Sequence, residues 1–360
     1  MTITPQLVAK YPLPDREHAS TSIDLSGPLP RLWVRTADSL RLHELGERAV
    51  PGAEFPSPSA APSAREWVAP DLSFAVFAVD GAYVAVGRDG RRLWEQQYGG
   101  WAVERWGYVD FSTVGARPAE GSGGELRIWL RLPSGLPGST LILTLDAEGT
   151  VLARSMIPCG GYERFVSLYW GEGGEVVGVR VSDDGPGATD HHARWESGRI
   201  VLGRPMAGPG ERLQRDRDLL DVDPHAALCM SRDRRGRDVS WHRLPSYERT
   251  ATLSLADFPA PGTDDCSVHD APWISGWGGF VDAGTAMVTL HNSYDEARVL
   301  RFGEDVWQEH SHWLADPVTG TLHGRIEYPM RDVDSAALLG DGTWTTTEWD
   351  ALYRWRAPRP

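Results

Sequence analysis

The sequence is poor in lysine. Lys10 is the single one, so arginine carries almost all of the positive charge. The 36 basic residues face 50 acidic ones, which gives a formal net charge of −14 at pH 7. Such a chain repels a polyanion on average, so we expect no nucleic acid among its partners. The one basic cluster, Arg232, Arg234, Arg235 and Arg237, straddles a glycine and is typical of a solvated hairpin tip.

Long apolar runs are also missing. No segment approaches the roughly 20 apolar residues that span a bilayer, and the first residues lack the apolar core of a signal peptide. We therefore expect no membrane partner and a cytoplasmic location. The three cysteines, Cys159, Cys229 and Cys266, are odd in number and widely spaced, which fits reduced thiols better than a disulfide framework.

Several catalytic signatures are absent. A phosphate-binding loop ending in Gly-Lys-Ser/Thr is excluded because Lys10 is the sole lysine, and "GEGGEVVG" at 171–178 lacks the third glycine of a dinucleotide fingerprint. Gly-x-Ser-x-Gly, His-Glu-x-x-His and paired Cys-x-x-Cys do not occur. No cofactor is predicted, and a divalent metal remains as an alternative.

Tryptophan and glycine are abundant, with 16 and 39 residues. Large aromatic side chains need deep apolar contacts, and frequent glycines mark frequent chain reversals. β-rich runs alternate with short glycine turns, which supply the positive φ angles that tight hairpins require. We place these turns at Asp80-Gly81, Asp89-Gly90, Glu148-Gly149, Ser197-Gly198, Thr319-Gly320 and Asp341-Gly342.

The regular hairpins predict an all-β protein, because helical periodicity is nearly absent. Their spacing of roughly 40–50 residues per four strands favours a β-propeller of seven blades, with six as the alternative. In that alternative the first and last groups combine into one blade. We expect residues 1–27 to be a loosely ordered arm and residues 28–360 a single propeller domain. The predicted strand groups are 31–52, 73–100, 125–158, 163–205, 216–254, 276–328 and 335–356.

The stretch "GAYVAVGRDGRRLWEQQYG" resembles the repeat of quinoprotein-like, YVTN-type propellers. "HWLADPVTGTLHGRIEYP" and "LGDGTWTTTEWDALYRW" resemble the C-terminal part of uncharacterised WD-repeat-like proteins of actinomycetes. The resemblance implies the β-propeller class, which includes scaffolds, lyases, hydrolases and oxidoreductases.

Long polar connections are the first candidates for function, because binding residues gather on loops held by a rigid scaffold. The connections at 182–192, 258–273 and 291–309 should meet on one rim of the propeller. Their imidazoles and carboxylates could bind a partner, or a metal through Cys266 and His269. The predicted rim residues are Asp183, Asp190, His191, His192, Asp264, Asp265, Asp295 and Glu296.

A second candidate lies on a predicted strand. His310 and His312 face the same side by the period-two alternation of a strand, which suits two ligands or an acid–base pair. With His291 and Tyr294 they form the candidate catalytic set. The structural alternative, that such histidines only hydrogen-bond within a packed blade, is favoured. Trp195, Trp241, Trp313 and Trp355 lie near hairpins and should be core between blades.

Two functional hypotheses follow. The favoured one is a binding module whose long-loop face holds a protein, peptide or small-molecule ligand. The alternative is an enzyme, a lyase or hydrolase of small-molecule or peptide metabolism, with His, Asp and Glu converging at the rim or the central channel. The missing catalytic motifs favour the first, so whether the protein is an enzyme remains open.

Overall fold

The computed structural model is built almost entirely of β-strands. In the part of the chain that it describes, a 3-10 turn at Leu255–Asp257 is the single helical element, and no helix is long and apolar enough to cross a membrane. The described residues are 1–14, 19–25, 29–59, 66–79, 81–97, 126–133, 139–158, 163–170, 176–183, 190–203, 217–223, 225, 227–233, 235–244, 246, 248–259, 272–292, 309–330, 333, 336–348 and 350–358.

The chain divides into two compact units. Unit 1 joins Met1–Pro12 to Met206–Pro360, and unit 2 is Leu13–Pro205. Among the described residues, unit 1 holds three sheets and unit 2 holds four. All pairings within them are antiparallel except one, so each sheet is a series of hairpins, as the glycine turns predict.

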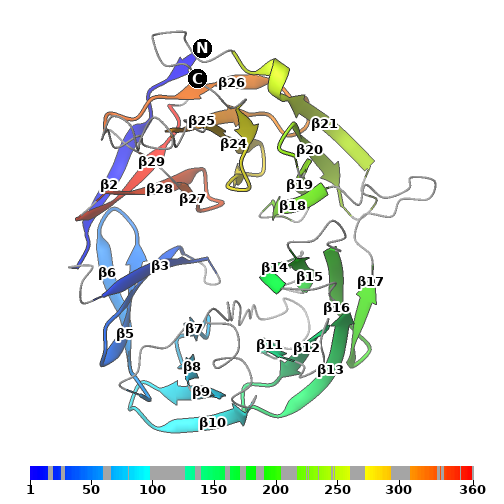
Figure 1. Cartoon of the computed structure of the whole chain (residues 1–360). Helices are drawn as coiled ribbons and strands as arrows, with labels where there is room; N and C mark the ends of the chain where they lie inside the picture. Colours follow the sequence, from blue (N-terminus) through cyan, green and yellow to red (C-terminus); the bar gives the residue numbers. More distant parts are fainter. Residues whose placement is uncertain are drawn as a thin grey trace, which may run out of the picture. The chain divides into compact units, whose positions relative to one another are not determined.

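Unit 2 begins with two sheets of four strands each, in which neighbours in sequence are neighbours in space (Figure 1). The first is β3 (Ser20–Asp24), β4 (Arg31–Arg35), β5 (Ser39–Leu45) and β6 (Ala49–Pro56). The second is β7 (Glu66–Val68), β8 (Phe74–Val79), β9 (Ala82–Gly87) and β10 (Arg92–Gln97). β8 and β9 are continuously apolar and buried, as expected of strands packed on both faces.

Two further sheets complete unit 2. One has three described strands, β11 (Ile128–Pro133), β12 (Ser139–Leu145) and β13 (Val151–Pro158). The other is β14 (Glu163–Trp170), β15 (Val176–Asp183), β16 (Asp190–Glu196) and β17 (Arg199–Gly203). The indole of Trp94 in β10 donates to the Ala147 carbonyl oxygen at 3.0 Å, which ties the turn between β12 and β13 to the preceding sheet.

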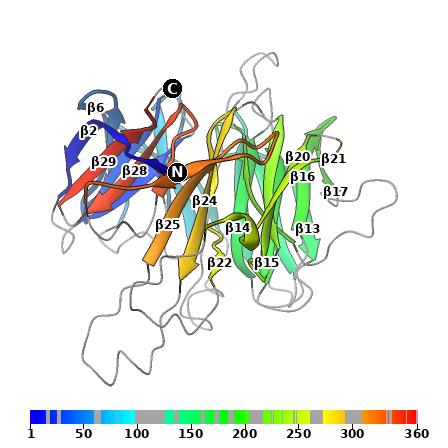
Figure 2. The same cartoon turned by 90° about the horizontal axis from the view of Figure 1, so that it is seen from above.

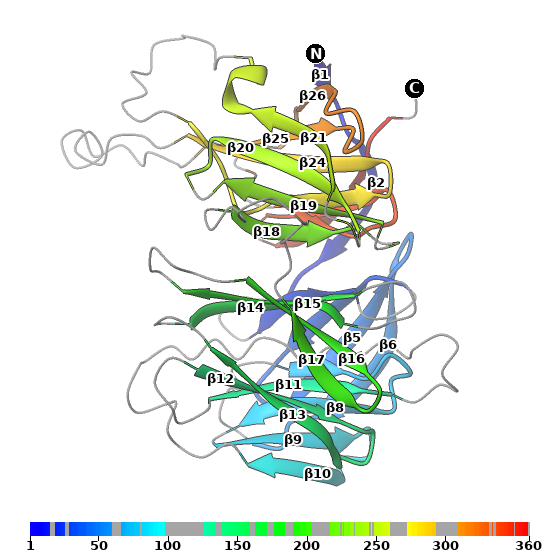
Figure 3. The ribbon, with the colours of Figure 1, turned by 90° about the vertical axis from the view of Figure 1, so that its right-hand side faces the viewer.

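Unit 1 starts with the sheet of β18 (Arg217–Val222), β19 (Leu228–Asp233), β20 (Asp238–Arg243) and β21 (Glu248–Ser254) (Figure 3). The next sheet contains β22 (Trp273–Ile274), β23 (Gly279–Asp282), β24 (Thr285–Asn292), β25 (Glu309–Ala315) and β26 (Leu322–Ile326). β22 and β23 both pair with β24, so they are two pieces of one interrupted strand.

The third sheet of unit 1 joins both ends of the chain (Figure 2). β27 (Ala336–Leu338), β28 (Thr343–Glu348) and β29 (Ala351–Arg356) are completed by β2 (Gln6–Pro12), which pairs with β29 along its length. β1 (Thr2–Ile3) pairs in parallel with β26. Residues 1–27, for which we predicted a loosely ordered arm, therefore contain three strands, because alternating apolar residues such as Ala9 and Tyr11 are buried there.

Each predicted strand group corresponds to one sheet. The first and last groups do not combine, since β3–β6 forms a sheet of its own and β2 completes the last one. The fold prediction of an all-β chain is confirmed, while the number of blades and the single-domain organisation stay predictions.

The predicted glycine turns have the expected backbone. Gly81, Gly90, Gly149, Gly198, Gly320 and Gly342 all have positive φ angles between 69° and 84°. An aspartate opens several of these turns and accepts main-chain amides, as Asp316 does from Val318 at 2.7 Å and Thr319 at 2.9 Å. These hydrogen bonds, that from Thr319 first, hold the pKa of Asp316 below its usual range.

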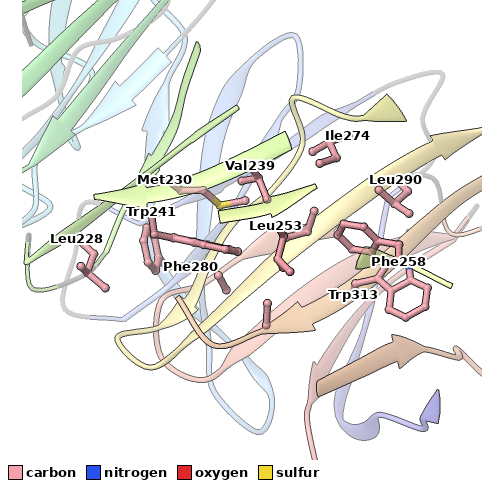
Figure 4. Packing of buried hydrophobic residues seen from close by; sticks show 13 residues of the cluster. Leu228, Met230, Val239, Trp241, Leu253, Phe258, Ile274, Phe280, Leu290 and Trp313 are labelled. Carbon is pink, nitrogen blue, oxygen red and sulfur yellow. The ribbon is translucent and has the colours of Figure 1, made fainter. Parts of the chain in front are cut away.

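The core of unit 1 lies between consecutive sheets. In Figure 4, Trp241 and Met230 pack beside Phe280 and Leu253, while Phe258 meets Trp313 edge-on with ring centroids 5.6 Å apart. A second cluster joins Leu314 and Ile326 to Trp344 and Trp355. The predictions that Trp241, Trp313 and Trp355 are core between sheets are therefore confirmed. Trp195 is only half-buried and carries the guanidinium of Arg127 over its ring at 5.1 Å.

Two buried arginines bind polar side chains of neighbouring strands and turns within their own sheets. Arg217 in β18 pairs with Asp238 and donates to the Ser231 hydroxyl oxygen at 3.0 Å, and Arg354 in β29 pairs with Asp341 and donates to Thr343 Oγ1 at 3.0 Å. A guanidinium presents five donors in a fixed plane, so it can satisfy a carboxylate and a hydroxyl together. Part of the arginine content is therefore structural.

Candidate functional site

Two of the predicted histidines are brought face to face. In the register of β24 and β25, His291 lies opposite His310, and Trp273 of β22 lies opposite His291. Directly opposed residues of antiparallel strands project their side chains to the same face. The three side chains therefore form one row across the end of the sheet at which residues 260–271 and 293–308 join it.

Their rings form a continuous contact series. Trp273 meets His291 edge-on at 4.1 Å between centroids, and His291 stacks on His310 at 4.6 Å with an interplanar angle of 13°. The indole of Trp277 also stacks on His310, at 6.0 Å between centroids and an interplanar angle of 15°. We call these four residues the aromatic column. Offset stacking and edge-on contacts are the arrangements that aromatic rings prefer, so the column is a self-supporting structure.

Trp277 is the exposed end of the column. Its relative exposure is 58%, whereas Trp273, His291 and His310 are half-buried. An indole this exposed leaves much of its apolar surface in water, which is unfavourable. Trp277 is therefore the part of the column that is open to a binding partner.

The local sequence explains why Trp277 projects outward. It lies in the break between β22 and β23, where its amide is 3.3 Å from the Ser275 hydroxyl oxygen. A Cβ on Gly278 would come within 2.8 Å of the Met287 carbonyl oxygen, and one on Gly279 would overlap the carboxylate of Asp221. The two glycines let the chain pass close to its neighbours, so the bulky indole is left on the outside.

His312 lies one step further along β25, on the same side as His310, and is enclosed. It is 1% exposed, and burial, followed by the charge of His310, lowers the pKa of its imidazole to about 4. Its ring meets Tyr328, whose hydroxyl accepts a hydrogen bond from the Trp344 indole at 3.0 Å. Burial raises the pKa of the Tyr328 hydroxyl, so both side chains are held in their neutral forms. The same-side placement of His310 and His312 is found, but only His310 approaches the surface.

The remaining predicted site residues divide into two groups. Asp183 ends β15, and Asp190, His191 and His192 begin β16 in unit 2. The rest lie outside the described residues, so the predicted common rim stays a prediction. These are Asp264, Asp265, Cys266, His269, Tyr294, Asp295 and Glu296.

Over the described ranges of the chain, no three His, Cys, Asp or Glu side chains gather where they could hold an ion. The predicted metal pair, Cys266 and His269, belongs to a segment that the structure leaves undescribed, and remains a prediction. Cys229 is a free, buried cysteine, and burial raises the pKa of its thiol to about 12.

Sequence reasoning missed two members of the column. Trp273 and Trp277 stand in "PWISGWGG", a glycine-rich run directly after a long polar connection. Two tryptophans in a segment too short and too rich in glycine for a core strand are a signal of an exposed aromatic surface. That signal was available without the structure.

Comparison with known proteins defines the class to which this fold belongs. The sequence matches no protein-family model and no curated protein. Among solved structures, it is similar to the β-propeller domain of Cps50 (Swd1) from Myceliophteria thermophila, with a TM-score of 0.53, 10% identity and coverage of 97% of this chain and 100% of that one.

Two WD40 domains are similar to the same degree. The Pan2 WD40 domain of Neurospora crassa has a TM-score of 0.51 and 10% identity, covering 99% of this chain and 96% of that one. The WD40 domain of SCAP from fission yeast has a TM-score of 0.51 and 9% identity, covering 98% of each chain. The likeness shows a WD-repeat-like β-propeller fold. The quinoprotein-like type and the actinomycete origin stay predictions.

Proposed function

We propose that this protein is a non-catalytic interaction module that binds a protein partner through the aromatic column. The observation that carries the proposal is the exposed indole of Trp277, stacked on His310 at the end of the β22–β26 sheet. Tryptophan is among the residues most enriched at the energetic centres of protein interfaces, because it covers a large area with few rotatable bonds.

The column suits binding because its base is fixed. His310 and His291 are held by paired strands, and Trp273 closes the row from a third strand, β22. A partner that packs on Trp277 therefore meets a surface already ordered, and little conformational entropy is lost on association. Burying an exposed indole contributes about 2 kcal/mol from its apolar area alone.

The architecture supports the same role. We propose that each of the seven sheets of the described chain is one propeller blade, with β2 from the N-terminal end completing the last one beside β29. The fold is similar to WD40 domains, which are propellers widely used for protein binding, and by analogy we propose the same use here. The free, buried thiol of Cys229 supports the proposed cytoplasmic setting.

The test is selection of ligands from a random peptide library displayed on phage, with the whole protein as bait. We expect enriched peptides whose affinity falls about tenfold or more in Trp277→Ala, the loss typical of an interface centre. The matched control is Val318→Ala. Val318 is 52% exposed, but it lies in the turn after the far end of β25, so its replacement should leave binding unchanged.

Three outcomes would contradict the proposal. A library from which no peptide is enriched would show that the protein binds no peptide of this kind. Enriched peptides that bind Trp277→Ala and the unchanged protein equally well would move the site elsewhere. Turnover of a substrate by the isolated protein, lost on replacing His310, would favour the lyase or hydrolase alternative instead.

A further inference from the structure

A basic hairpin tip lies beside the aromatic column. The turn from Asp233 to Arg237 joins β19 to β20, and the Gly236 carbonyl oxygen accepts the amide of Ile274 at 2.7 Å. A Cβ on Gly236 would stand 2.8 Å from the Cβ of Trp273, so the tip and β22 touch directly. The basic tip and the column are therefore parts of one surface of unit 1.

Arginine supplies the charge of this tip. Arg235 and Arg237 flank Gly236 and are exposed. Arg232 lies beneath the adjoining turn: its guanidinium donates to the Ile274 carbonyl oxygen at 3.0 Å and lies 3.5 Å from the Cβ position of Gly276, next to Trp277. Arg232 thus lies beside the column, and Arg235 and Arg237 are exposed on the adjoining tip, in a protein whose net charge is −14.

Three carboxylates that the structure describes near the tip have hydrogen-bond or ion-pair partners. Asp233 accepts the amide of Arg235 through Oδ1 at 3.3 Å, and Asp238 is paired with Arg217. Asp221, behind Gly279, is buried and accepts the amides of Val222 and Phe280. Arg235 and Arg237 are the basic residues of the tip that the structure describes as exposed.

We propose that this surface recognises an acidic linear segment of a protein partner, in which carboxylates pair with Arg235 and Arg237 and an apolar or aromatic side chain packs on Trp277. The inference rests on the proposed function and names its partner class. Arginine binds carboxylates through two parallel hydrogen bonds, and the aromatic platform supplies the apolar half of the contact. The acidic remainder of the protein repels extended polyanions, which favours a short segment over a nucleic acid.

The test measures fluorescence polarisation of synthetic capped peptides with the full-length protein. The probe has a central phenylalanine between runs of glutamate, and the matched peptides replace every glutamate by glutamine or the phenylalanine by alanine. We expect the acidic probe to bind about tenfold more tightly than either matched peptide, and its affinity to fall as salt rises from about 50 to about 300 mM.

Protein variants separate charge from packing. The double variant Arg235→Gln/Arg237→Gln should lower the affinity for the acidic probe about tenfold and leave the glutamine peptide unaffected. The matched control is Arg243→Gln, since Arg243 is equally exposed but ends β20 at the opposite end from the tip. Trp277→Ala should weaken the acidic probe and the glutamine peptide alike.

The outcomes distinguish this inference from the proposed function. If library peptides are selected through Trp277 but are neutral or basic, and Arg235→Gln/Arg237→Gln binds them normally, the interaction module stands and its acidic ligand is wrong. If a single-stranded oligouridine binds more tightly than the acidic peptide and loses affinity in the same arginine variant, the surface recognises nucleic acid and the inference is overturned.

Discussion

The imidazole of His312 meets the phenol ring of Tyr328 nearly at right angles, with ring centroids 5.6 Å apart and an interplanar angle of 88°. His312 is buried, and Tyr328 is half-buried against the apolar cluster between the β22–β26 sheet and the sheet that joins the termini. His312 reaches that position because it shares a face of β25 with Leu314, which belongs to the same core. The ring is therefore held in its neutral form.

This burial predicts a loss of stability in acid. The pKa of His312 is about 4 in the folded protein against an ordinary 6.5, so the unfolded chain binds more protons between these values. The free energy of unfolding should fall as pH drops through this window, by about 3 kcal/mol in total. In urea unfolding, the free energy of unfolding of His312→Leu relative to that of the unchanged protein should increase as the pH falls toward 4. His323→Leu, at an exposed position of β26, is the control and should leave the slope intact.

The buried carboxyl of Asp221 predicts that the free energy of unfolding changes with pH in the opposite direction. Burial raises the pKa of its carboxyl to about 7, although the amides of Phe280 and Val222 favour the charged form. The folded protein then holds a proton that the unfolded chain has lost, so stability falls as pH rises from about 4 to 7. The unfolding free energy of Asp221→Asn, relative to the unchanged protein, should improve by about 4 kcal/mol across this window. A flat difference would show that the carboxylate stays ionised.

Close packing at Gly279 gives a third prediction. A side chain there would overlap the carboxylate of Asp221, which is fixed by two main-chain amides. Gly279→Ala should lower the free energy of unfolding by about 3 kcal/mol, in the range of overpacked cores. Gly284→Ala is the matched control: its Cβ would meet only Asp282 Oδ1 at 3.7 Å, so thermal melting should shift little. Equal melting temperatures for the two variants would contradict this packing.

The pairing of the two N-terminal strands, β1 and β2, gives a fourth prediction. Deletion of residues 1–12 removes β1 and β2 and exposes the edges of β26 and β29. Unpaired edges favour association between molecules, so we expect a lower melting temperature and concentration-dependent aggregation by light scattering. Deletion of residues 1–3 tests β1 alone and should give a smaller shift, because β1 pairs with β26 only through Thr2 and Ile3. A deletion variant that melts like the full chain would show that β2 is dispensable.

The sequence predicted the sheets well because hairpins are local. Gly149 or Gly320 determines a turn within a few residues, and alternation determines which strand residues are buried. The alternation also placed His310 and His312 on one side. The alternation could not predict how deeply His312 is buried, because its enclosure depends on Tyr328, which follows β26, and on the neighbouring Trp344 in β28. For the same reason the sequence did not predict the burial of Arg217 and Arg354, whose carboxylate partners, Asp238 and Asp341, come from other parts of the same sheet.

The pairing of β2 with β29 also has a consequence for biosynthesis. Gln6 lies opposite Arg356, so the last sheet cannot be completed until β29 has left the ribosome. Contacts between such distant residues are costly in loop-closure entropy and form slowly. Until then, the alternating apolar face of residues 6–12 stays uncovered. During translation β2 therefore stays unpaired until β29 has been made, and an unpaired strand is exposed to aggregation.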